Sequence, residues 1–250
     1  MAERLQPAAA ELVELAAVNA RDAVLDIACG TGNAALMAAR RAERVVGVDS
    51  EPRLLEIAAM RGRSAGVAVD WVCADALSPE LPERAFSGVL SAFGLMYVPD
   101  QSAAAAALAR ASAPGARIAL ASWTPGSFMP LMGGMLSSYL PSPPPGSAPP
   151  SRWGDEAAVT ELLRAHAIEV RVMRRSSLRL SFADCTEARE FLIRTAGNIL
   201  AERSNLERAG RWRDLEHDLE NLVRDQNENS RQAVELDCEY LLVLAAASVE

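Results

Sequence analysis

Short apolar runs alternate with amphipathic stretches along the first half of the chain. The runs are nearly continuous in apolar residues, as in strands that are buried on both faces. They cover residues 23–27, 44–48, 67–73, 88–92 and 117–123. Helix-like stretches precede and separate them at residues 5–19, 33–41, 52–61 and 103–111. Strands and helices in this order predict a parallel sheet with helices on both sides and right-handed crossovers.

The pattern changes after residue 123. Residues 128–139 are rich in Met and Leu, and the proline-rich residues 140–151 predict a loop. The remaining elements are a helix at 155–166, a strand at 168–182, a largely helical stretch at 187–229 and a closing strand at 236–246. We therefore expect an α/β fold: a doubly wound, Rossmann-like, mostly parallel sheet of seven strands, with a helical insertion near the C-terminus.

Composition narrows the class of protein. The chain has 250 residues, half of them hydrophobic, and a net charge of −8, which disfavours a nucleic-acid surface. No apolar stretch is long enough to span a membrane, and the N-terminus lacks a signal-type apolar core. The four cysteines, Cys29, Cys73, Cys185 and Cys238, are far apart and form no metal-binding pattern. These features predict a cytoplasmic protein without a metal site.

An acid and a glycine loop end the first predicted strand. Residues 24–36 read VLDIACGTGNAAL and carry Asp26 before Gly30, Thr31 and Gly32. Glycines between a strand and a helix let a ligand approach backbone N–H groups closely. Residues 30–35 also fit the G-x-G-x-x-A dinucleotide pattern, with Asp49 19 residues beyond Gly30.

Asp26 helps to separate the candidate ligands. A carboxylate beside the loop would repel the pyrophosphate of a dinucleotide, and a low dielectric makes that repulsion costly. A ligand with an ammonium or sulfonium group and no phosphate would tolerate the acid, and S-adenosylmethionine is such a ligand. Asp49, at the end of the second strand, is placed to accept hydrogen bonds from both ribose hydroxyls.

Four motifs extend this pattern along the chain. VLDIACGTGNAAL, VVGVDSEPRLLEIA, VCADALSPELPERAFSGVLSAFGLMYVPD and ARIALASWTP follow one another in order. Their order and spacing resemble those of class I S-adenosylmethionine-dependent methyltransferases, in particular bacterial small-molecule enzymes related to ubiquinone and menaquinone biosynthesis. The resemblance is strong over residues 24–125 and continues weakly through RWGDEAAVTELL and CEYLLVLAA.

The resemblance implies a set of cofactor-binding residues. They are Asp26, Ala28, Cys29, Gly30, Thr31, Gly32, Asp49, Ser50, Asp75, Ala76, Ser91, Ala92 and Phe93. The family pattern places Asp75 at the adenine amine and residues 91–93 beside the transferred methyl. Two positions depart from it. Ala28 stands where many members have glycine, with no loss expected, and Ser87 stands where an acid is common, with a consequence left open.

The acceptor and the catalytic groups are less well marked. We expect one domain over residues 1–250, with a cofactor-binding core at 20–125. Segments 126–154 and 186–230 are expected to form the acceptor pocket, because the N-terminal helix is too short to cover it alone. The candidate pocket residues are Tyr97, Phe128, Met132 and Met135, although residues 128–139 fit core packing equally well.

Methyl transfer needs alignment of the nucleophile and exclusion of water, and a base only where the acceptor must first lose a proton. Tyr97 and Tyr139 are weak catalytic candidates, and Asp100 is another. His166 is interpreted as a helix-end or packing residue and His217 as a surface residue.

Three functions remain open at this point. The first is transfer of a methyl group from S-adenosylmethionine to a small, apolar or aromatic metabolite, with O-, N- or C-methylation undetermined. The second keeps the cofactor but promotes a non-methylating cyclisation, or serves as a binding module. The third is a nicotinamide oxidoreductase, which the glycine loop favours and Asp26 disfavours. A small-molecule acceptor is the expected partner, and the oligomeric state is open.

Overall fold

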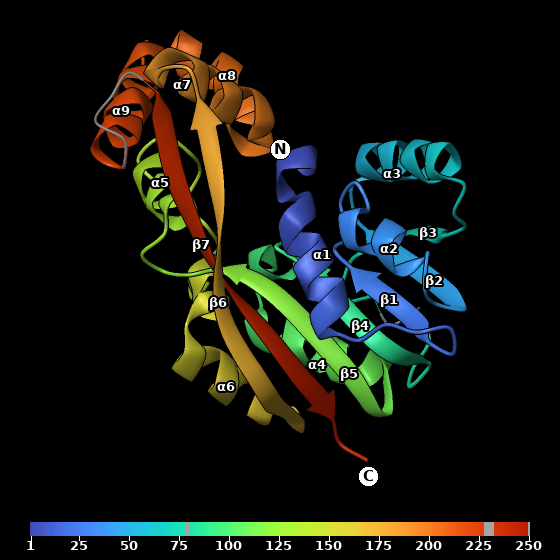
Figure 1. The fold of residues 1–250 in the computed structure, drawn as a ribbon. Coiled ribbons are helices and arrows are strands. Elements are labelled where there is room, and N and C mark those ends of the chain that lie inside the picture. The colour runs from blue at the N-terminus through green and yellow to red at the C-terminus, as the bar shows by residue number, and fades with distance from the viewer. Residues whose placement is uncertain (79–80, 228–232, 250) are drawn as a thin grey trace.

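The computed structural model describes residues 1–78, 81–227 and 233–249, which form a seven-stranded sheet flanked by helices (Figure 1). The strand order is β3-β2-β1-β4-β5-β7-β6. The strands are β1 (Ala23–Ile27), β2 (Arg44–Asp49), β3 (Asp70–Cys73), β4 (Phe86–Ala92), β5 (Ser112–Trp123), β6 (Ile168–Phe182) and β7 (Val234–Ala247). Strands β1 to β5 pair in parallel, and β7 runs antiparallel to both β5 and β6. The predicted Rossmann-like, mostly parallel fold is confirmed.

Helices lie on both faces of this sheet. The α-helices are α1 (Gln6–Leu15), α2 (Asn33–Ala38), α3 (Pro52–Ala65), α4 (Gln101–Ala111), α5 (Phe128–Leu136), α6 (Glu156–Arg164), α7 (Cys185–Thr195), α8 (Gly197–Arg208) and α9 (Trp212–Asp225). Short 3-10 helices are η1 (Ala2–Leu5), η2 (Leu95–Tyr97) and η3 (Pro150–Gly154). In Figure 1, α1 and α2 lie in front of the sheet, and α4 and α6 lie behind it.

Local chemistry explains where several helices begin. The side chains of Glu51, Asp100, Asp155 and Asp184 accept hydrogen bonds from backbone N–H groups in the first turns of α3, α4, α6 and α7. Such N-caps satisfy donors that the helix itself cannot pair. Asp100 therefore has a structural role, and the structure gives no reason to keep it as a catalytic candidate.

The third strand is shorter than the predicted 67–73. Gly66 ends α3 in a left-handed conformation, and the Val67 N–H donates to the Gly62 carbonyl. Val67 thus belongs to the helix cap, and the strand begins only at Asp70.

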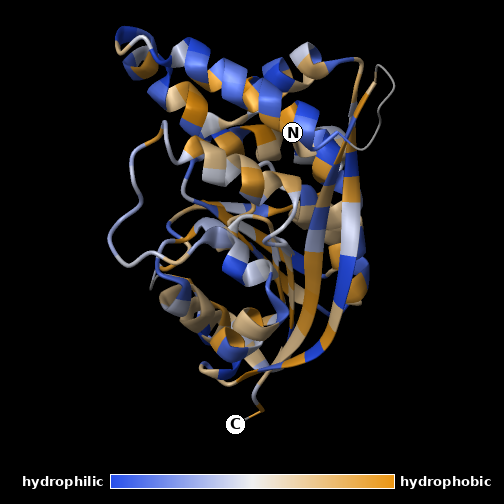
Figure 2. Cartoon of the chain, turned by 90° about the vertical axis from the view of Figure 1, so that its left-hand side faces the viewer, coloured by the Kyte–Doolittle hydropathy of each residue, from blue (hydrophilic) through white to orange (hydrophobic). Residues whose placement is uncertain are grey.

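The last two strands form a long arm that carries the helical insertion. Helices α7 to α9 lie between β6 and β7 in the chain and sit at the far end of this arm (Figure 1). Leu215, Leu219 and Val223 of α9 are buried and share one face of the helix. Hydrophilic residues gather toward the outside of these helices (Figure 2). Residues 228–229 of the predicted helical stretch, and residues 228–230 of the predicted insertion, lie outside the described residues.

Ser87 occupies the amino-terminal part of β4, at the sheet edge opposite the carboxyl ends of the strands. Its hydroxyl donates a 2.8 Å hydrogen bond to Asp22 Oδ1 and accepts one of 3.2 Å from the Ala23 N–H. Asp22 is 4% exposed and pairs with Arg117. The buried acid at this end of the sheet is therefore supplied by Asp22, with Ser87 as its hydrogen-bond donor.

No helix in the described part of the chain is both long and apolar enough to cross a membrane.

Candidate functional site

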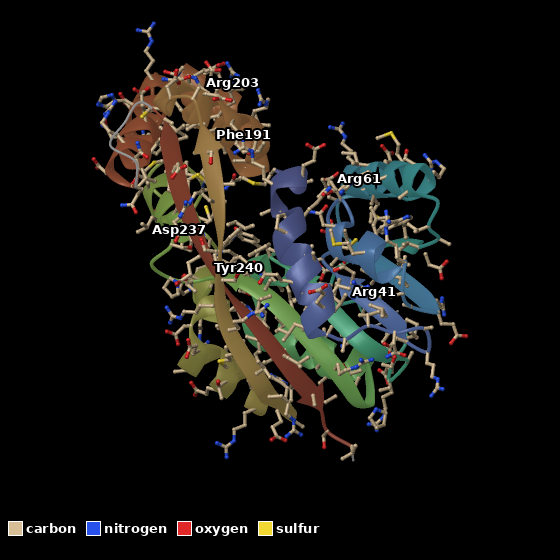
Figure 3. All side chains as sticks on the ribbon, in the orientation of Figure 1. Arg41, Arg61, Phe191, Arg203, Asp237 and Tyr240 are labelled. Atoms are coloured by element: carbon tan, nitrogen blue, oxygen red, sulfur yellow. The ribbon has the colours of Figure 1, made fainter. Side chains whose placement is uncertain are left out.

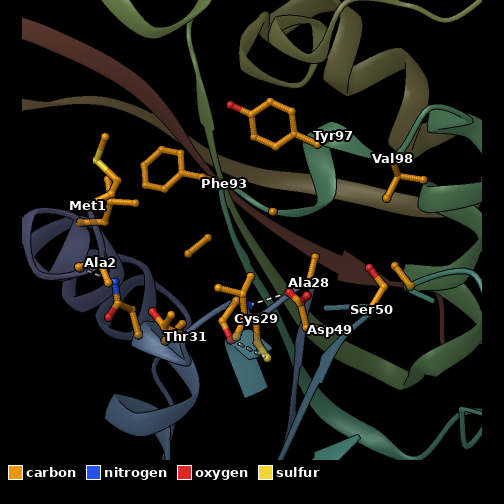
Figure 4. Close-up of a pocket in the computed structure, with 18 of the residues that line it drawn as sticks. Met1, Ala2, Ala28, Cys29, Thr31, Asp49, Ser50, Phe93, Tyr97 and Val98 are labelled. Atoms are coloured by element: carbon orange, nitrogen blue, oxygen red, sulfur yellow. Dashed lines mark hydrogen bonds between the residues drawn. The ribbon is translucent and has the colours of Figure 1, made fainter. Parts of the chain in front are cut away.

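A cavity of about 640 Å³ opens at the carboxyl ends of the central strands. This volume suits a small-molecule site, and ligands of open α/β sheets bind at this edge. Its lining comes from the loops after β1, β2, β3 and β4, from the last residue of β5 and from the N-terminal segment. Helices α2, α3, α5 and α7 add further residues. Figure 4 shows Met1 and Phe93 toward one end, with Asp49 and Ser50 toward the other.

Most of the predicted cofactor residues meet in this cavity. Those that line it are Ala28, Cys29, Gly30, Thr31, Asp49, Ser50, Asp75, Ala76, Ala92 and Phe93. Tyr97, a candidate for both the acceptor pocket and catalysis, lines it as well. Asp26, Gly32 and Ser91 do not line it. Ser91 is buried, and its Oγ accepts a 3.1 Å hydrogen bond from the Leu95 N–H, so it holds the turn after β4.

The glycine loop has three residues in the left-handed region. These are Ala28 (φ +55°), Gly30 (φ +55°) and Gly32 (φ +80°). A Cβ at Gly30 would meet nothing within 4 Å, whereas one at Gly32 would fall 2.6 Å from the Trp71 ring. Gly32 therefore permits close packing against β3, and Gly30 leaves the backbone open to the cavity.

Ala28 and Gly94 lie against each other. A Cβ at Gly94 would fall 2.1 Å from the Ala28 carbonyl oxygen, so only glycine fits there. The left-handed φ of Ala28 costs about 1–2 kcal/mol for a residue that has a Cβ. We expected alanine to replace glycine here without loss. There is room for the methyl group of Ala28, but the left-handed backbone conformation is less favourable for alanine than for glycine, so the expectation is wrong in that respect.

Asp26 lies beneath the loop and is 1% exposed. Its Oδ2 accepts a 2.8 Å hydrogen bond from the Ala35 N–H of α2, and its buried Oδ1 has no partner within the described residues. Burial raises the pKa of Asp26 to about 7 and nearby Asp49 adds to the rise, while the hydrogen bond from Ala35 opposes it. The site thus holds an under-satisfied carboxyl group behind the glycine loop.

Asp49 binds the backbone on both sides. Its Oδ2 accepts a 2.7 Å hydrogen bond from the Gly30 N–H, and its Oδ1 accepts one of 2.9 Å from the Glu51 N–H. Asp49 therefore helps to shape the glycine loop, a role beyond the predicted ribose contact. Each carboxylate oxygen retains a further lone pair for a ligand.

Arg61 of α3 also holds this loop, a contact that the sequence did not predict. Its guanidinium donates to the Thr31 carbonyl oxygen (2.6 Å), to Thr31 Oγ1 (3.0 Å) and to Asn33 Oδ1 (2.8 Å). Asn33 Nδ2 donates in turn to the Ala2 carbonyl oxygen at 2.7 Å. An arginine within a helix 28 residues away carries no sequence signal of such a contact.

Aromatic side chains form the other end of the cavity. Phe93 stacks on Trp123 with ring centroids 3.8 Å apart, and both rings contact buried Tyr240 edge-on. Tyr97 is 58% exposed at the cavity. Desolvation by the surrounding atoms raises the pKa of Tyr97, although a Trp123 hydrogen bond opposes the shift. This hydroxyl therefore stays protonated at neutral pH.

The predicted acceptor residues of α5 lie elsewhere. Phe128 and Met132 are 2% and 7% exposed and belong to the core, and Met135 packs against that core. None of the three lines the cavity, whereas Met129, on another face of the helix, does. For Phe128 and Met132 the core interpretation holds, because residues four apart share one face of a helix.

Tyr139 is also outside the cavity lining. Its hydroxyl pairs with Asp218 of α9, and the Arg211 guanidinium lies 4.7 Å from its ring centroid. Desolvation, followed by the effect of Asp218, raises its pKa to about 12. Tyr139 thus fastens the end of α5 to α9, and its position does not support a catalytic role.

The histidines lie outside the cavity lining too. His166 Nε2 lies 3.0 Å from Ser102 Oγ, and His217 is exposed on α9.

Several lining residues were not predicted. They are Met1, Ala2, Leu5, Asn33, Ala34, Leu54, Leu77, Gly94, Val98, Pro99, Trp123, Met129 and Thr195. Trp123 ends a predicted strand at the carboxyl edge, which was an available signal. Thr195 offered none, because its place depends on where the β6–β7 arm positions α7.

Comparison with known proteins identifies the family. A family profile described as a methyltransferase domain matches residues 24–115. A demethylmenaquinone methyltransferase of Thermus thermophilus is 36% identical over 151 residues, which cover 52% of this chain and 69% of that protein. An uncharacterized protein of Mycobacterium tuberculosis is 33% identical over 185 residues, covering 74% of this chain and 67% of that protein.

The fold comparison agrees. The crystal structure of a putative methyltransferase from Bacillus halodurans superposes with a TM-score of 0.69 at 16% identity, over 96% of this chain and 98% of that one. The glycine loop and the acid at the end of β2 lie within the matched residues, and the strand order 3-2-1-4-5-7-6 extends the agreement to the rest of the sheet. The chain belongs to the class I S-adenosylmethionine-dependent methyltransferases.

Proposed function

We propose that this chain transfers a methyl group from S-adenosylmethionine to a small, apolar or aromatic metabolite. The observation that carries the proposal is the two-ended character of the cavity. Carboxylates and the glycine loop line one end, and Phe93, Trp123 and Met129 line the other. A charged, hydroxyl-rich cofactor suits the first end, and a largely apolar acceptor suits the second.

The residues of the first end fit the cofactor. Asp26 Oδ1 is a buried acceptor without a partner among the described residues, which suits a nearby cation. The open space at Gly30 lets a ligand approach the backbone. Asp49 at the end of β2 and Asp75 after the neighbouring β3 both line the cavity. A ribose held by Asp49 would therefore place the attached adenine near Asp75. We propose Gly30, Asp49 and Asp75 as the principal cofactor contacts, with Asp26 acting from behind the loop through its charge.

The bound cofactor supplies a sulfonium-activated methyl group, and the chain has to align the acceptor and exclude water. The Phe93–Trp123 stack provides a flat apolar wall, and Tyr97 offers a protonated hydroxyl that can orient a polar atom of the acceptor. Ser91 fixes the turn that carries Tyr97 through its bond to the Leu95 N–H.

The described lining of the acceptor end holds no histidine and no carboxylate that could serve as a base. No lining residue within the described ranges is a histidine, and the only ionisable acids of the lining, Asp49 and Asp75, lie at the cofactor end. The raised pKa of Tyr97 makes it a poor base. We therefore propose an acceptor whose nucleophile needs no enzymatic deprotonation, such as an amine, an enolate carbon or an acidic phenol.

The residues that line the cavity also support the proposed assignment of cofactor and acceptor binding to different segments of the chain. Residues 20–125 supply the cofactor end, while segments 126–154 and 186–230 contribute Met129 and Thr195. The N-terminal segment adds Met1, Ala2 and Leu5, so it takes a larger part in the cavity than its length suggested. All four cysteines are free thiols, which supports the proposal of a cytoplasmic, reducing compartment.

Isotope transfer tests the proposal. The protein is incubated with methyl-labelled S-adenosylmethionine and fractionated metabolites, and labelled products are identified by mass spectrometry. We expect label in apolar or aromatic products. Label only in highly charged products would contradict the acceptor class, and cofactor binding with an unlabelled rearrangement product would favour the cyclisation alternative.

A further inference from the structure

The N-terminal segment borders the cavity and is attached to the protein on two sides. Ala2 and Leu5 line the cavity. On the cofactor side, Asn33 Nδ2 donates a 2.7 Å hydrogen bond to the Ala2 carbonyl oxygen, and Arg61 holds Asn33 from α3. Asn33, at the start of α2, therefore links the glycine loop directly to the N-terminal segment.

On the other side, Arg4 reaches the helical insertion. Its guanidinium lies 4.4 Å from the ring centroids of both Phe182, the last residue of β6, and Phe191 of α7. It also donates a 3.1 Å hydrogen bond to the Ser181 carbonyl oxygen. Figure 3 shows Arg61 and Phe191 on opposite sides of the N-terminal helix.

Two independent attachments therefore hold one short segment against the cavity. The segment is a single 3-10 turn, Ala2–Leu5, without a side-chain N-cap, so its own hydrogen bonds hold it weakly. Its C-terminal end continues into α1, and contacts with Asn33 on one side and through Arg4 on the other hold the rest of it. A guanidinium placed on aromatic rings is a favourable contact that strengthens as water is excluded.

We propose that residues 2–5 form a strap that closes over the bound cofactor, with Arg4 as the positioning residue that latches it to the insertion. The inference rests on the proposed placement of the cofactor against the glycine loop. Release of the latch opens the cavity for exchange of cofactor and product. When the strap is closed, Leu5 and helix α7 lie next to each other at the acceptor end of the cavity.

The latch has a measurable kinetic consequence. In Arg4→Ala, S-adenosylhomocysteine should dissociate about five- to thirtyfold faster, the range expected for loss of one or two such contacts. The association rate should change little. Stopped-flow tryptophan fluorescence measures both rates. Arg4→Lys should restore part of the effect, because an ammonium retains the interaction with the rings.

Arg194→Ala is the matched control. Arg194 is exposed on α7 and lies 5.9 Å from the Phe191 ring centroid, and it belongs to the insertion and not to the strap. The same charge is removed near the same ring, so a purely electrostatic effect would appear in both variants. We expect the dissociation rate of Arg194→Ala to stay within about twofold of the wild type.

Proteolysis reports on the strap itself. Glu3 is exposed, and cleavage after it by a glutamate-specific protease can be followed by mass spectrometry. S-adenosylhomocysteine should slow this cleavage in the wild type and in Arg194→Ala, but much less in Arg4→Ala. Equal protection and equal dissociation rates in all three proteins would overturn the strap. Absence of ligand binding to the wild type would instead overturn the proposed cofactor placement.

Discussion

Asp49 and Gly30 are joined by a 2.7 Å hydrogen bond from the Gly30 N–H to Asp49 Oδ2. The acid at the end of β2 therefore holds the loop after β1 in the conformation that opens its backbone to the cavity. The same carboxylate accepts from the Glu51 N–H through Oδ1. The shape of the loop and the proposed ribose contact depend on one side chain.

Asp49→Ala should accordingly lower both affinity and stability. Loss of charged hydrogen bonds, which contribute about 1.5–3 kcal/mol each, should weaken cofactor binding at least about tenfold. The unpaired Gly30 and Glu51 N–H groups should lower the free energy of unfolding by about 1–3 kcal/mol. Calorimetry and chemical denaturation measure the two effects.

Asp70→Ala is the control for this change. Asp70 is an exposed carboxylate of neighbouring β3 that pairs only at the surface, with Arg44 at 3.0 Å. Its removal should cost less than about 1 kcal/mol and leave cofactor affinity unchanged. An Asp49→Ala protein that behaves like this control would show that the loop does not depend on Asp49.

Ala28→Gly should stabilise the protein. Ala28 has a φ of +55°, which costs a residue with a Cβ about 1–2 kcal/mol, and the added freedom of glycine in the unfolded chain offsets part of the gain. We expect a net increase of about 0.5–1 kcal/mol by urea denaturation. Ala59→Gly, within α3, should instead lose about 1 kcal/mol. Equal losses in both variants would contradict the strain at Ala28.

Ser87→Asp should destabilise the protein without affecting the cofactor. The new carboxylate would face Asp22, whose Oδ1 now accepts the 2.8 Å hydrogen bond of Ser87. Two acids at a buried position repel, and we expect a loss of about 1–3 kcal/mol that Asp22→Asn largely relieves in the double variant. Because Ser87 lies at the opposite end of β4 from the cavity, cofactor affinity should hold. A loss of affinity without a loss of stability would contradict this account.

Asp26 should make stability depend on pH. Its pKa is raised to about 7 in the folded chain, against about 3.9 when unfolded. Between these values the folded state binds more protons, so stability should fall as the pH rises from about 4 to 7, with little further change above. Asp26→Asn should lack this component. The free energies of unfolding of the two proteins are measured from pH 4.5 to 8.5, and their difference gives the contribution of Asp26. A difference that does not change with pH would contradict a buried Asp26 with a raised pKa.

Sequence periodicity predicted the strands and the fold class because each buried strand reads as an apolar run of its own, as in residues 23–27. The cofactor end was predictable because Gly30, Asp49 and Asp75 lie at or shortly after the carboxyl ends of strands, and a parallel sheet brings those ends together. The acceptor end was not, because Met129 and Met132 are three residues apart in one apolar helix and only tertiary packing decides which faces the cavity. The Arg61 and Arg4 contacts depend on distant segments and leave no local pattern.

The central claim is that the aromatic end of the cavity receives the acceptor. Its most direct test is the set of labelled products formed by Met129→Trp, which places a larger ring at that end while cofactor affinity serves as the internal control. The account predicts at least about a tenfold loss of methyl transfer to the larger acceptors, with cofactor affinity within about twofold of the wild type. An unchanged product pattern, or a loss of cofactor affinity that parallels the loss of transfer, would contradict it.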